Sequence, residues 1–313
     1  MSPALALPLF AVSAVITLAA AAFFADKLDH VGPRLGLPES AVGLLTAVAA
    51  DTPEITSAIV ALVSGDKEAS LGVVLGSNVF NLAAMVGLSA VLTGAVMIGR
   101  RALAVEGTVS VLCLVITAAL VLGVLDAPVA LILFLVIAIP YVIFTLRRPH
   151  VPHAGAEQKH VRGEAVLKEI LLMIPAVAAI VLGSTGMVRA ALSLGDHWNV
   201  SETVTGVLVL AVLTSLPNAF TAVRLGLGGR GDALVTEALA SNTINLTGGI
   251  LVPALFVGLA AASTSVKLDF LWVGVMTVVA LAALAATRGM GRVAGLVLIA
   301  MYLAFVALHL AHR

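Results

Sequence analysis

The chain has 313 residues, of which 61% are apolar and only 11% are charged, and its formal net charge is zero. A soluble domain of this length carries about twice that fraction of charged residues, so an ordinary soluble fold is excluded, and the balanced charge does not indicate a nucleic-acid partner. The single cysteine, Cys113, excludes both a disulfide framework and a thiolate metal site.

Ten stretches are long and apolar enough to cross a hydrocarbon core about 30 Å thick. The first lacks a basic region before it and a cleavage site after it, so we interpret it as a retained helix rather than a signal peptide. We therefore predict an all-α integral membrane protein in a lipid bilayer. In chain order its spans are expected at residues 5–25, 38–64, 68–94, 102–123, 126–146, 166–190, 201–227, 231–260, 268–287 and 291–311.

Only one connection between these spans is long. It comprises residues 147–165 and carries several arginine, lysine and histidine residues. The histidines could bind a metal or sense pH, but we interpret the segment as a solvated polar linker. It divides the ten spans five and five, which predicts a first unit at 1–146 and a second at 166–313.

Lysine and arginine residues are distributed unequally between the two sides of the expected bundle. By the positive-inside rule, the richer side faces the cytoplasm. We therefore expect a multi-pass protein of the cell (plasma) membrane, with both termini outside and the 147–165 connection in the cytoplasm. The odd-numbered connections hold thirteen of the 17 basic residues: Lys27, Arg34, Arg100, Arg101, Arg147, Arg148, Lys159, Arg162, Lys168, Arg224, Arg230, Arg288 and Arg292.

Part of the sequence is repeated. Residues 46–82 align without a gap with residues 210–246, at a constant offset of 164, and eleven of the 37 positions are identical. About a tenth would match by chance in so apolar a chain, so the repeat is interpreted as genuine. The informative matches are polar or conformational: Pro53 with Pro217, Gly65 with Gly229, Ser77 with Ser241, Asn78 with Asn242, and Asn81 with Asn245.

The two copies fall on expected spans 2 and 3 and on expected spans 7 and 8. Because an odd number of spans separates them, the two five-helix halves are expected to be inverted relative to each other. Pro53 and Pro217 are expected to interrupt spans 2 and 7, since each removes a backbone hydrogen bond and frees carbonyl oxygens. This arrangement predicts a transport site near the middle of the membrane. A duplication kept for packing alone is the alternative.

Oxygen-bearing side chains gather around the two prolines. Asp51 and Glu54 lie three residues apart, and so on one helical face beside Pro53. Carboxylate, hydroxyl and amide oxygens, with no histidine or cysteine among them, favour Na⁺, Ca²⁺ or Mg²⁺ over zinc or copper. The other candidates are Thr214, Ser215 and Asn218 beside Pro217, with Ser77, Asn81, Ser241 and Asn245 on the partner spans.

Two carboxylates within one helical turn need neutralisation inside a membrane. An ionised group at mid-bilayer costs about 2.5–3.5 kcal/mol even on the lenient insertion scale. Bound cations or protons would supply it; a protonated pair with a structural role is the alternative. Glu237, four residues before Ser241, is a further candidate that could equally reach the interface or be protonated, whereas Glu106 is interpreted as an interfacial charge.

The two copies resemble the alpha-repeats of the sodium/calcium exchanger superfamily. The family pattern is roughly G-T-S-x-P-E, followed about twenty residues later by G-S-N-x-x-N or D. The first copy has A-A-D-T-P-E at 49–54 and G-S-N-V-F-N at 76–81, and the second has L-T-S-L-P-N at 213–218 and A-S-N-T-I-N at 240–245. The ten spans and the central loop are also similar to those of prokaryotic members.

This resemblance implies an antiporter that moves Ca²⁺ against Na⁺ or H⁺ by alternating access, with spans 1 and 6 sliding across the other eight. The sequence departs from the family in three places: Asn218 stands where the family usually has Glu, Asp51 where it has a hydroxyl, and Asn245 where some members have Asp. The coupling ion and stoichiometry are therefore open. The ion ligands that the resemblance implies are Glu54, Ser77, Asn81, Thr214, Ser215 and Ser241.

Other functions stay open at this point. The first alternative is a monovalent cation or proton exchanger that does not use Ca²⁺. An intramembrane metal-dependent hydrolase is disfavoured by the lack of histidine pairs within the spans, so an enzyme is not expected. A channel would normally need symmetric oligomers around a pore. We expect no cofactor, inorganic cations as the transported species, and a monomer as an acceptable unit, with the oligomeric state open.

Overall fold

The computed structural model describes residues 1–34, 47–146, 163–258 and 263–311, and these residues are almost entirely helical. The helices of the first half are α1 (Pro3–Arg34), α3 (Thr52–Val63), α4 (Lys67–Asn81), α5 (Ser89–Thr93), α6 (Arg100–Val121) and α7 (Ala127–Leu146). Those of the second half are α8 (Gly163–Trp198), α9 (Glu202–Val204), α10 (Ala211–Leu227), α11 (Gly231–Leu246), α12 (Val252–Val257), α13 (Thr264–Thr287) and α14 (Arg292–Ala311).

The helices agree with the expected spans, with shifts at their ends. Within the described residues, nine helical stretches are long and apolar enough to cross a membrane, and Thr52–Val63 is a shorter apolar helix. The first part of expected span 2 lies outside the described residues, as does most of the 147–165 connection. The largest shifts are at α1, which continues to Arg34, and at α8, which begins at Gly163 and continues to Trp198.

Three short π-helical segments continue α-helices inside the bundle. They are η1 (Leu82–Leu88) after α4, η2 (Thr205–Leu210) before α10, and η3 (Thr247–Leu251) after α11. A π-helical turn widens the backbone and occurs frequently at functional sites. Two of the three begin within two residues of Asn81 and Asn245, which are both candidate site residues.

Two short strands correct the all-α expectation. β1 (Ala95–Met97) pairs antiparallel with β2 (Gly289–Gly291), and Ala95 lies opposite Gly291. The strands connect α5 to α6 and α13 to α14. Only three residues contribute on each side, which is too short for a sequence periodicity to be recognised.

Further hydrogen bonds join the two strand-containing connections, and the connection between α10 and α11, at one end of the bundle. The backbone N–H of Ile98 donates to the carbonyl of Arg288 at 3.1 Å, and the N–H of Gly99 donates to Asp232 Oδ1 at 2.6 Å. The connections that follow α5, α10 and α13 therefore meet at this end, which we call the strand end.

The other connections meet at the opposite end. The hydroxyl of Thr203 donates to Glu68 Oε2 at 2.7 Å, and Lys67 Nζ lies 3.5 Å from the carbonyl of Gly258. These contacts join the connections that precede α4 and follow α8 and α12. The described connections that these contacts place thus alternate between the two ends, as helices that each cross the membrane once require.

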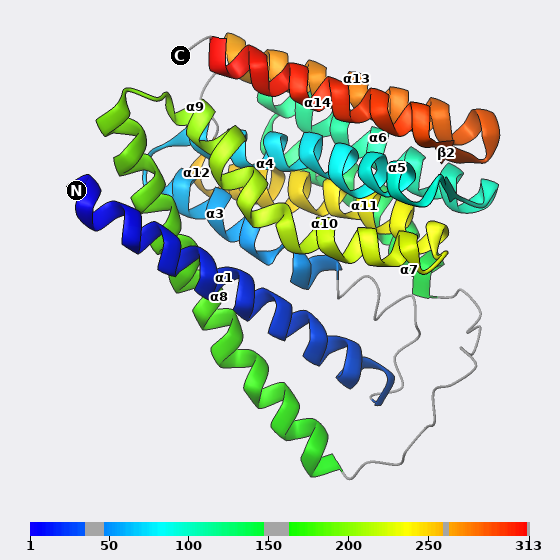
Figure 1. Cartoon of the computed structure of the whole chain (residues 1–313), viewed down its shortest axis with the longest axis horizontal. Helices are drawn as coiled ribbons and strands as arrows, with labels where there is room; N and C mark the ends of the chain where they lie inside the picture. The colour runs from blue at the N-terminus through cyan, green and yellow to red at the C-terminus, as the bar shows by residue number, and fades with distance from the viewer. Residues whose placement is uncertain (35–46, 147–162, 259–262, 312–313) are drawn as a thin grey trace.

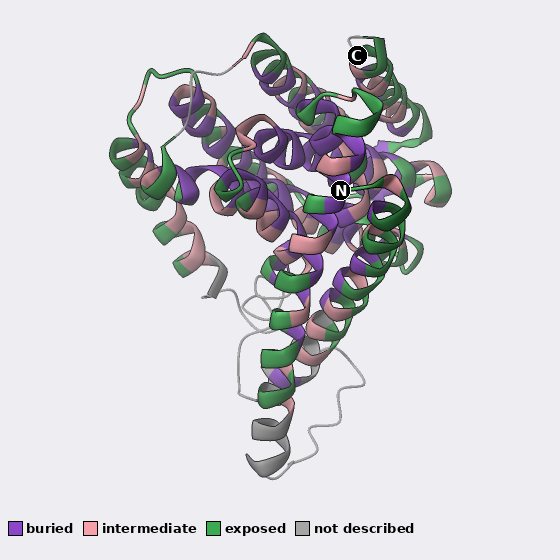
Figure 2. Ribbon diagram, turned by 90° about the vertical axis from the view of Figure 1, so that its left-hand side faces the viewer, coloured by how far each residue is buried: buried purple, intermediate pink, exposed green. Residues whose placement is uncertain are grey.

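The core is built mainly from α4 and the helices around it, whereas α1 and α8 contribute only Ala14, Met187, Val188 and Ala191 to its buried cluster. In the span Lys67–Thr93, 89% of the most apolar window is buried, against 6% for Ala127–Phe144. Figure 2 shows the buried residues concentrated in the central helices and the exposed ones on the outer helices. α1 and α8 pack side by side and extend away from the remaining helices (Figure 1).

Candidate ion-binding site

The carboxylates of Asp51 and Glu54 lie at the start of α3. Residues 47–50 are helical, Asp51 is a turn residue, and Pro53 occupies the first turn of α3, where its missing N–H is tolerated. Both acidic side chains are 0% exposed. The backbone N–H of Asp51 donates to the carbonyl of Ala47 and that of Ile55 donates to the carbonyl of Asp51, so helical hydrogen bonds continue through this turn.

Pro217 has a smaller effect on its helix than we expected. α10 continues across Pro217 from Ala211 to Leu227. The interruption predicted for this span is therefore limited to the hydrogen bond that Pro217 cannot donate to the carbonyl of Leu213. Asn218 follows directly and is buried, with its side chain directed at α3.

The Asn218 side chain joins the two carboxylates. Its Nδ2 donates to Asp51 Oδ1 at 2.6 Å and lies 3.3 Å from both Glu54 Oε1 and Ser241 Oγ. The hydroxyl of Ser241 also donates to Asp51 Oδ1. Residues from α3, α10 and α11, and the turn before α3, therefore meet in one cluster, which we call the carboxylate cluster: Asp51, Glu54, Asn218 and Ser241.

α4 reaches the same cluster through Asn81. Asn81 Nδ2 donates to Ser241 Oγ at 3.1 Å and to Asn242 Oδ1 at 3.2 Å. Asn78 and Asn242 bind each other reciprocally: each side-chain amide donates to the other's backbone carbonyl, at 3.2 and 3.1 Å. The pair is 164 residues apart, which is the offset of the sequence repeat. These bonds hold α4 against α11 next to the carboxylates.

Two predicted hydroxyl ligands are bonded to backbone carbonyls. Thr214 Oγ1 donates to the carbonyls of Leu210 and Ala211, at 2.9 and 3.2 Å, and Ser77 Oγ lies 3.5 Å from the carbonyl of Ala211. Each hydroxyl oxygen retains lone pairs that could face a cation. Ser77 also ties α4 to α10.

Several buried oxygens in this region have no hydrogen-bond partner among the described residues. A buried polar atom without a partner carries a desolvation cost of about 1–3 kcal/mol, so such a group of oxygens indicates a place for a ligand. They are Asp51 Oδ2, Glu54 Oε2, Ser57 Oγ, Asn78 Oδ1, Asn81 Oδ1, Ser215 Oγ, Asn218 Oδ1 and Asn245 Oδ1.

Glu237 does not belong to the carboxylate cluster as defined by these hydrogen bonds. It is half-buried on α11, one helical turn before Ser241. Glu106, interpreted from the sequence as an interfacial charge, is instead buried, and it accepts a hydrogen bond of 2.8 Å from Tyr141. Both acids lie in apolar sequence with few charged neighbours, so the sequence did not show which of them is buried and which lies at the site.

Sequence reasoning missed three residues of the site region. Ser57 lies one turn after Glu54, and the spacing of three residues could have indicated it. Asn78 and Asn242 were noticed as repeat matches but were not included among the candidate residues. Within the described chain, no three Asp, Glu, His or Cys side chains are grouped closely enough to hold a metal, so a cation here would rely on two carboxylates and neutral oxygens.

Comparison with protein families gives a match over most of the chain. A family model described as sodium/calcium exchanger protein matches residues 5–147 and 168–311. An uncharacterised membrane protein of Methanocaldococcus jannaschii is 23% identical over 266 residues, which cover 83% of each chain. Sodium/potassium/calcium exchanger 1 of Rattus norvegicus is 32% identical over 101 residues, or 32% of this chain and 9% of that protein.

Two groups of solved structures share the fold. A structure of the sodium-calcium exchanger NCX_Mj aligns with a TM-score of 0.69 at 18% identity, covering 98% of this chain and 99% of that one. A structure of the H⁺/Ca²⁺ exchanger CAX aligns with a TM-score of 0.77 at 15% identity, covering 98% and 87%. At these identities the likeness establishes the architecture, and the choice of ions depends on the site itself.

Proposed function

Because the chain belongs to the sodium/calcium exchanger family, we propose that it is a secondary active antiporter that exchanges Ca²⁺ against Na⁺ or H⁺. The observation that carries this proposal is the carboxylate cluster. Two fully buried acids face a set of neutral oxygens from four helices, with lone pairs left without partners. Oxygen ligands of this kind suit a hard cation. Members of the family are transporters, which favours transport over the hydrolase considered above.

The charge of the carboxylate cluster supports the binding of two positive charges in each transport cycle. Ionised together, Asp51 and Glu54 carry a charge of −2, which one Ca²⁺ or two monovalent ions neutralise. Protonation of both acids does the same. Exchange between these states needs no other charged group in the cluster.

The ligand set comprises the carboxylates and the neighbouring oxygens. Asp51 and Glu54 supply charge, while hydroxyl and amide oxygens complete the shell. The side-chain amide of Asn218 supports this role, because a half-turn about its last bond replaces the Nδ2 donor with its oxygen. The further ligands we propose are Ser77, Asn81, Thr214, Ser215, Asn218, Ser241 and Asn245.

Alternating access fits the arrangement of the helices. An inverted pair of five-helix repeats is supported by the reciprocal bonds of Asn78 with Asn242, and by the contact of Glu54 with Asn218, since both pairs are 164 residues apart. α1 and α8 pack against each other at the edge of the bundle, so they can move as a unit while the cluster stays in place. In this proposal their movement opens the site to one side at a time.

We also propose the location and the orientation of the protein that the sequence predicts. The protein lies in the plasma membrane with both termini outside. The strand end, where Arg100, Arg101, Arg230 and Arg288 lie, then faces the cytoplasm.

Asn218 favours one alternative, a monovalent cation or proton exchanger. An amide in place of a carboxylate leaves two acids, and Ca²⁺ affinity rises with the number of charged ligands. Such an exchanger would use the same cluster without carrying Ca²⁺.

Flux measurements separate these possibilities. The purified protein is reconstituted in proteoliposomes, and uptake of radioactive Ca²⁺ is measured under an outward Na⁺ gradient and, separately, under an outward H⁺ gradient. Uptake that depends on one of the two gradients supports the proposal and identifies the coupling ion. Na⁺ flux driven by a pH gradient, with no Ca²⁺ uptake under either gradient, establishes the alternative. Absence of all three fluxes contradicts both.

A further inference from the structure

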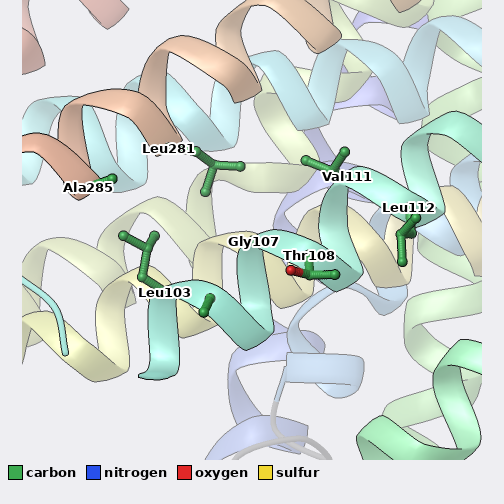
Figure 3. Close-up of a pocket in the computed structure, with 8 residues that line it drawn as sticks. Leu103, Gly107, Thr108, Val111, Leu112, Leu281 and Ala285 are labelled. Atoms are coloured by element: carbon green, nitrogen blue, oxygen red, sulfur yellow. The ribbon is translucent and has the colours of Figure 1, made fainter. Parts of the chain in front are cut away.

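An apolar groove lies on the outside of the bundle between α6 and α13. Its volume is about 380 Å³, and Figure 3 shows Leu103, Gly107 and Val111 from α6 facing Leu281 and Ala285 from α13. Thr108 is the one polar residue among those that line it. None of the residues that line the groove belongs to the carboxylate cluster.

The length of the groove matches one leaflet of a bilayer. Its α6 lining extends from Leu103 to Leu112, which corresponds to about 13 Å at 1.5 Å per residue. Half of a hydrocarbon core of about 30 Å is nearly the same length. An apolar groove of this length on a membrane-spanning face has the dimensions of a single acyl chain.

Three arginines mark one end of the groove. Arg100 and Arg101 precede Leu103 on α6, and Arg288 follows Ala285 at the end of α13. The hydrogen bond of 3.1 Å from Ile98 N–H to the carbonyl of Arg288 brings these two segments together. All three arginines are exposed, and among the described residues none is paired with a carboxylate. The guanidinium of Arg101 lies 4.9 Å from the ring centroid of Phe144 on α7.

We propose that this groove binds an anionic glycerophospholipid. One acyl chain lies along Leu103, Gly107 and Val111, and the phosphate is held by Arg100, Arg101 and Arg288 at the strand end. Guanidinium groups bind phosphate in a bidentate manner, and basic pockets between membrane helices bind lipid headgroups. The positive charge of the arginines and the length of the apolar groove therefore both fit an anionic phospholipid. The inference is independent of which ions the protein transports.

Binding is measured by native mass spectrometry of the full chain in detergent. Phosphatidylglycerol and phosphatidylcholine with identical acyl chains are compared, and inorganic phosphate serves as a headgroup without a chain. We expect phosphatidylglycerol to bind at least about tenfold more tightly than phosphatidylcholine, and phosphate not to bind. The triple variant Arg100→Gln/Arg101→Gln/Arg288→Gln should abolish this preference. Ala285→Trp, which fills the groove, should weaken the binding of both lipids.

Matched controls change similar residues elsewhere. Arg224→Gln/Arg230→Gln removes two exposed arginines from the same end, and Val115→Trp alters an exposed position of α6 outside the groove. Both should bind phosphatidylglycerol as the wild type does. Equal affinity for the two lipids, or unchanged binding in the triple variant and in Ala285→Trp, would overturn the proposal. A wild-type dimer that Ala285→Trp converts to a monomer would also overturn it, because a second copy of the chain would then occupy the groove.

Discussion

At the scale of single residues, the site depends on Asn218 as much as on its acids. In the sequence, Asn218 stands where the family usually has a glutamate, so a carboxylate is missing from this position. In the structure its Nδ2 is the donor that lies between Asp51 and Glu54, at 2.6 and 3.3 Å. An amide can donate its N–H groups to the carboxylates and can also offer an oxygen to a cation, whereas an ionised carboxylate at this position would offer oxygens only.

Glu54 is predicted to be essential for exchange. Glu54→Gln removes a charge with little change in volume, so the bound cation loses half of the charge that neutralises it. We expect Ca²⁺ uptake in proteoliposomes to fall below about a tenth of the wild-type rate, with a normal elution profile in size-exclusion chromatography. Asp196→Asn, at an exposed carboxylate near the end of α8, is the control and should keep full activity. A Glu54→Gln rate above half that of the wild type would place the site elsewhere.

Asp51 and Asn218 are predicted to compensate for each other. Asp51→Ser alone leaves one central carboxylate and should weaken Ca²⁺ binding severely. Asn218→Glu alone adds a third carboxylate within reach of two others, and mutual repulsion should make transport steeply dependent on pH. The double variant restores two acids and should recover exchange, with a coupling energy of about 1–3 kcal/mol because the side chains are in contact.

The measurement for this pair is Ca²⁺ affinity and flux of the wild type, both single variants and the double variant at two pH values. Strictly additive effects would show that the two positions do not share an ion. The proposed relocation of acid from one half to the other would then be wrong.

At the scale of helices, close approach around α4 is what brings the oxygens together. Asn78 and Asn242 hold α4 to α11, while Gly76 lets α4 approach η2 and α10. A Cβ on Gly76 would lie 2.6 Å from the carbonyl oxygen of Val207 and 2.8 Å from Ala211 Cβ. Ser77 follows Gly76 directly, so the helix contact and the site share one segment.

Gly76→Ala is therefore predicted to destabilise the protein. The added methyl group meets backbone atoms that cannot move as a side chain would, and overpacking of this kind costs about 1–3 kcal/mol. We expect a lower melting temperature in detergent, measured by thermal unfolding, together with reduced flux. Gly291→Ala is the matched control, because no atom lies within 4 Å of its added Cβ, and it should melt as the wild type does. Equal melting temperatures would contradict this packing.

At the scale of the whole molecule, the two ends of the bundle differ in their contacts and in their charge. The strand end joins the connections after α5, α10 and α13, and the opposite end joins those around α4, α9 and α12. For these described connections, the alternation between the two ends follows from the structure. Which end faces the cytoplasm rests on the distribution of arginine and lysine.

Labelling with a membrane-impermeant thiol reagent tests this orientation. Ser64→Cys places an exposed thiol between α3 and α4, and Gly291→Cys places one at the strand end. We expect intact cells to label Ser64→Cys and not Gly291→Cys, and permeabilised cells to label both. The native Cys113 is buried and serves as the background control. The reverse pattern in intact cells would invert the proposed topology.

The sequence by itself determined the membrane class, the positions of nearly all spans and the family, and it predicted most of the polar residues that the structure brings together. These are linear properties: hydrophobic length is read along the chain, and the repeat is a constant offset of 164. The ends of α1 and α8 differ from the predicted ones. The strands Ala95–Met97 and Gly289–Gly291 were missed, because three residues have no periodicity to detect.

Only the tertiary structure decided which oxygens meet. Asp51 and Ser241 are 190 residues apart, and no spacing rule predicts their hydrogen bond. The sequence offered Glu237 as a further candidate one helical turn before Ser241, yet only Ser241 joins the carboxylate cluster. Gly76 has Ala240 as its counterpart in the repeat, so the alignment did not show that a side chain is excluded there. Contacts across helices depend on how the helices approach, and that distance is set by packing rather than by any local pattern.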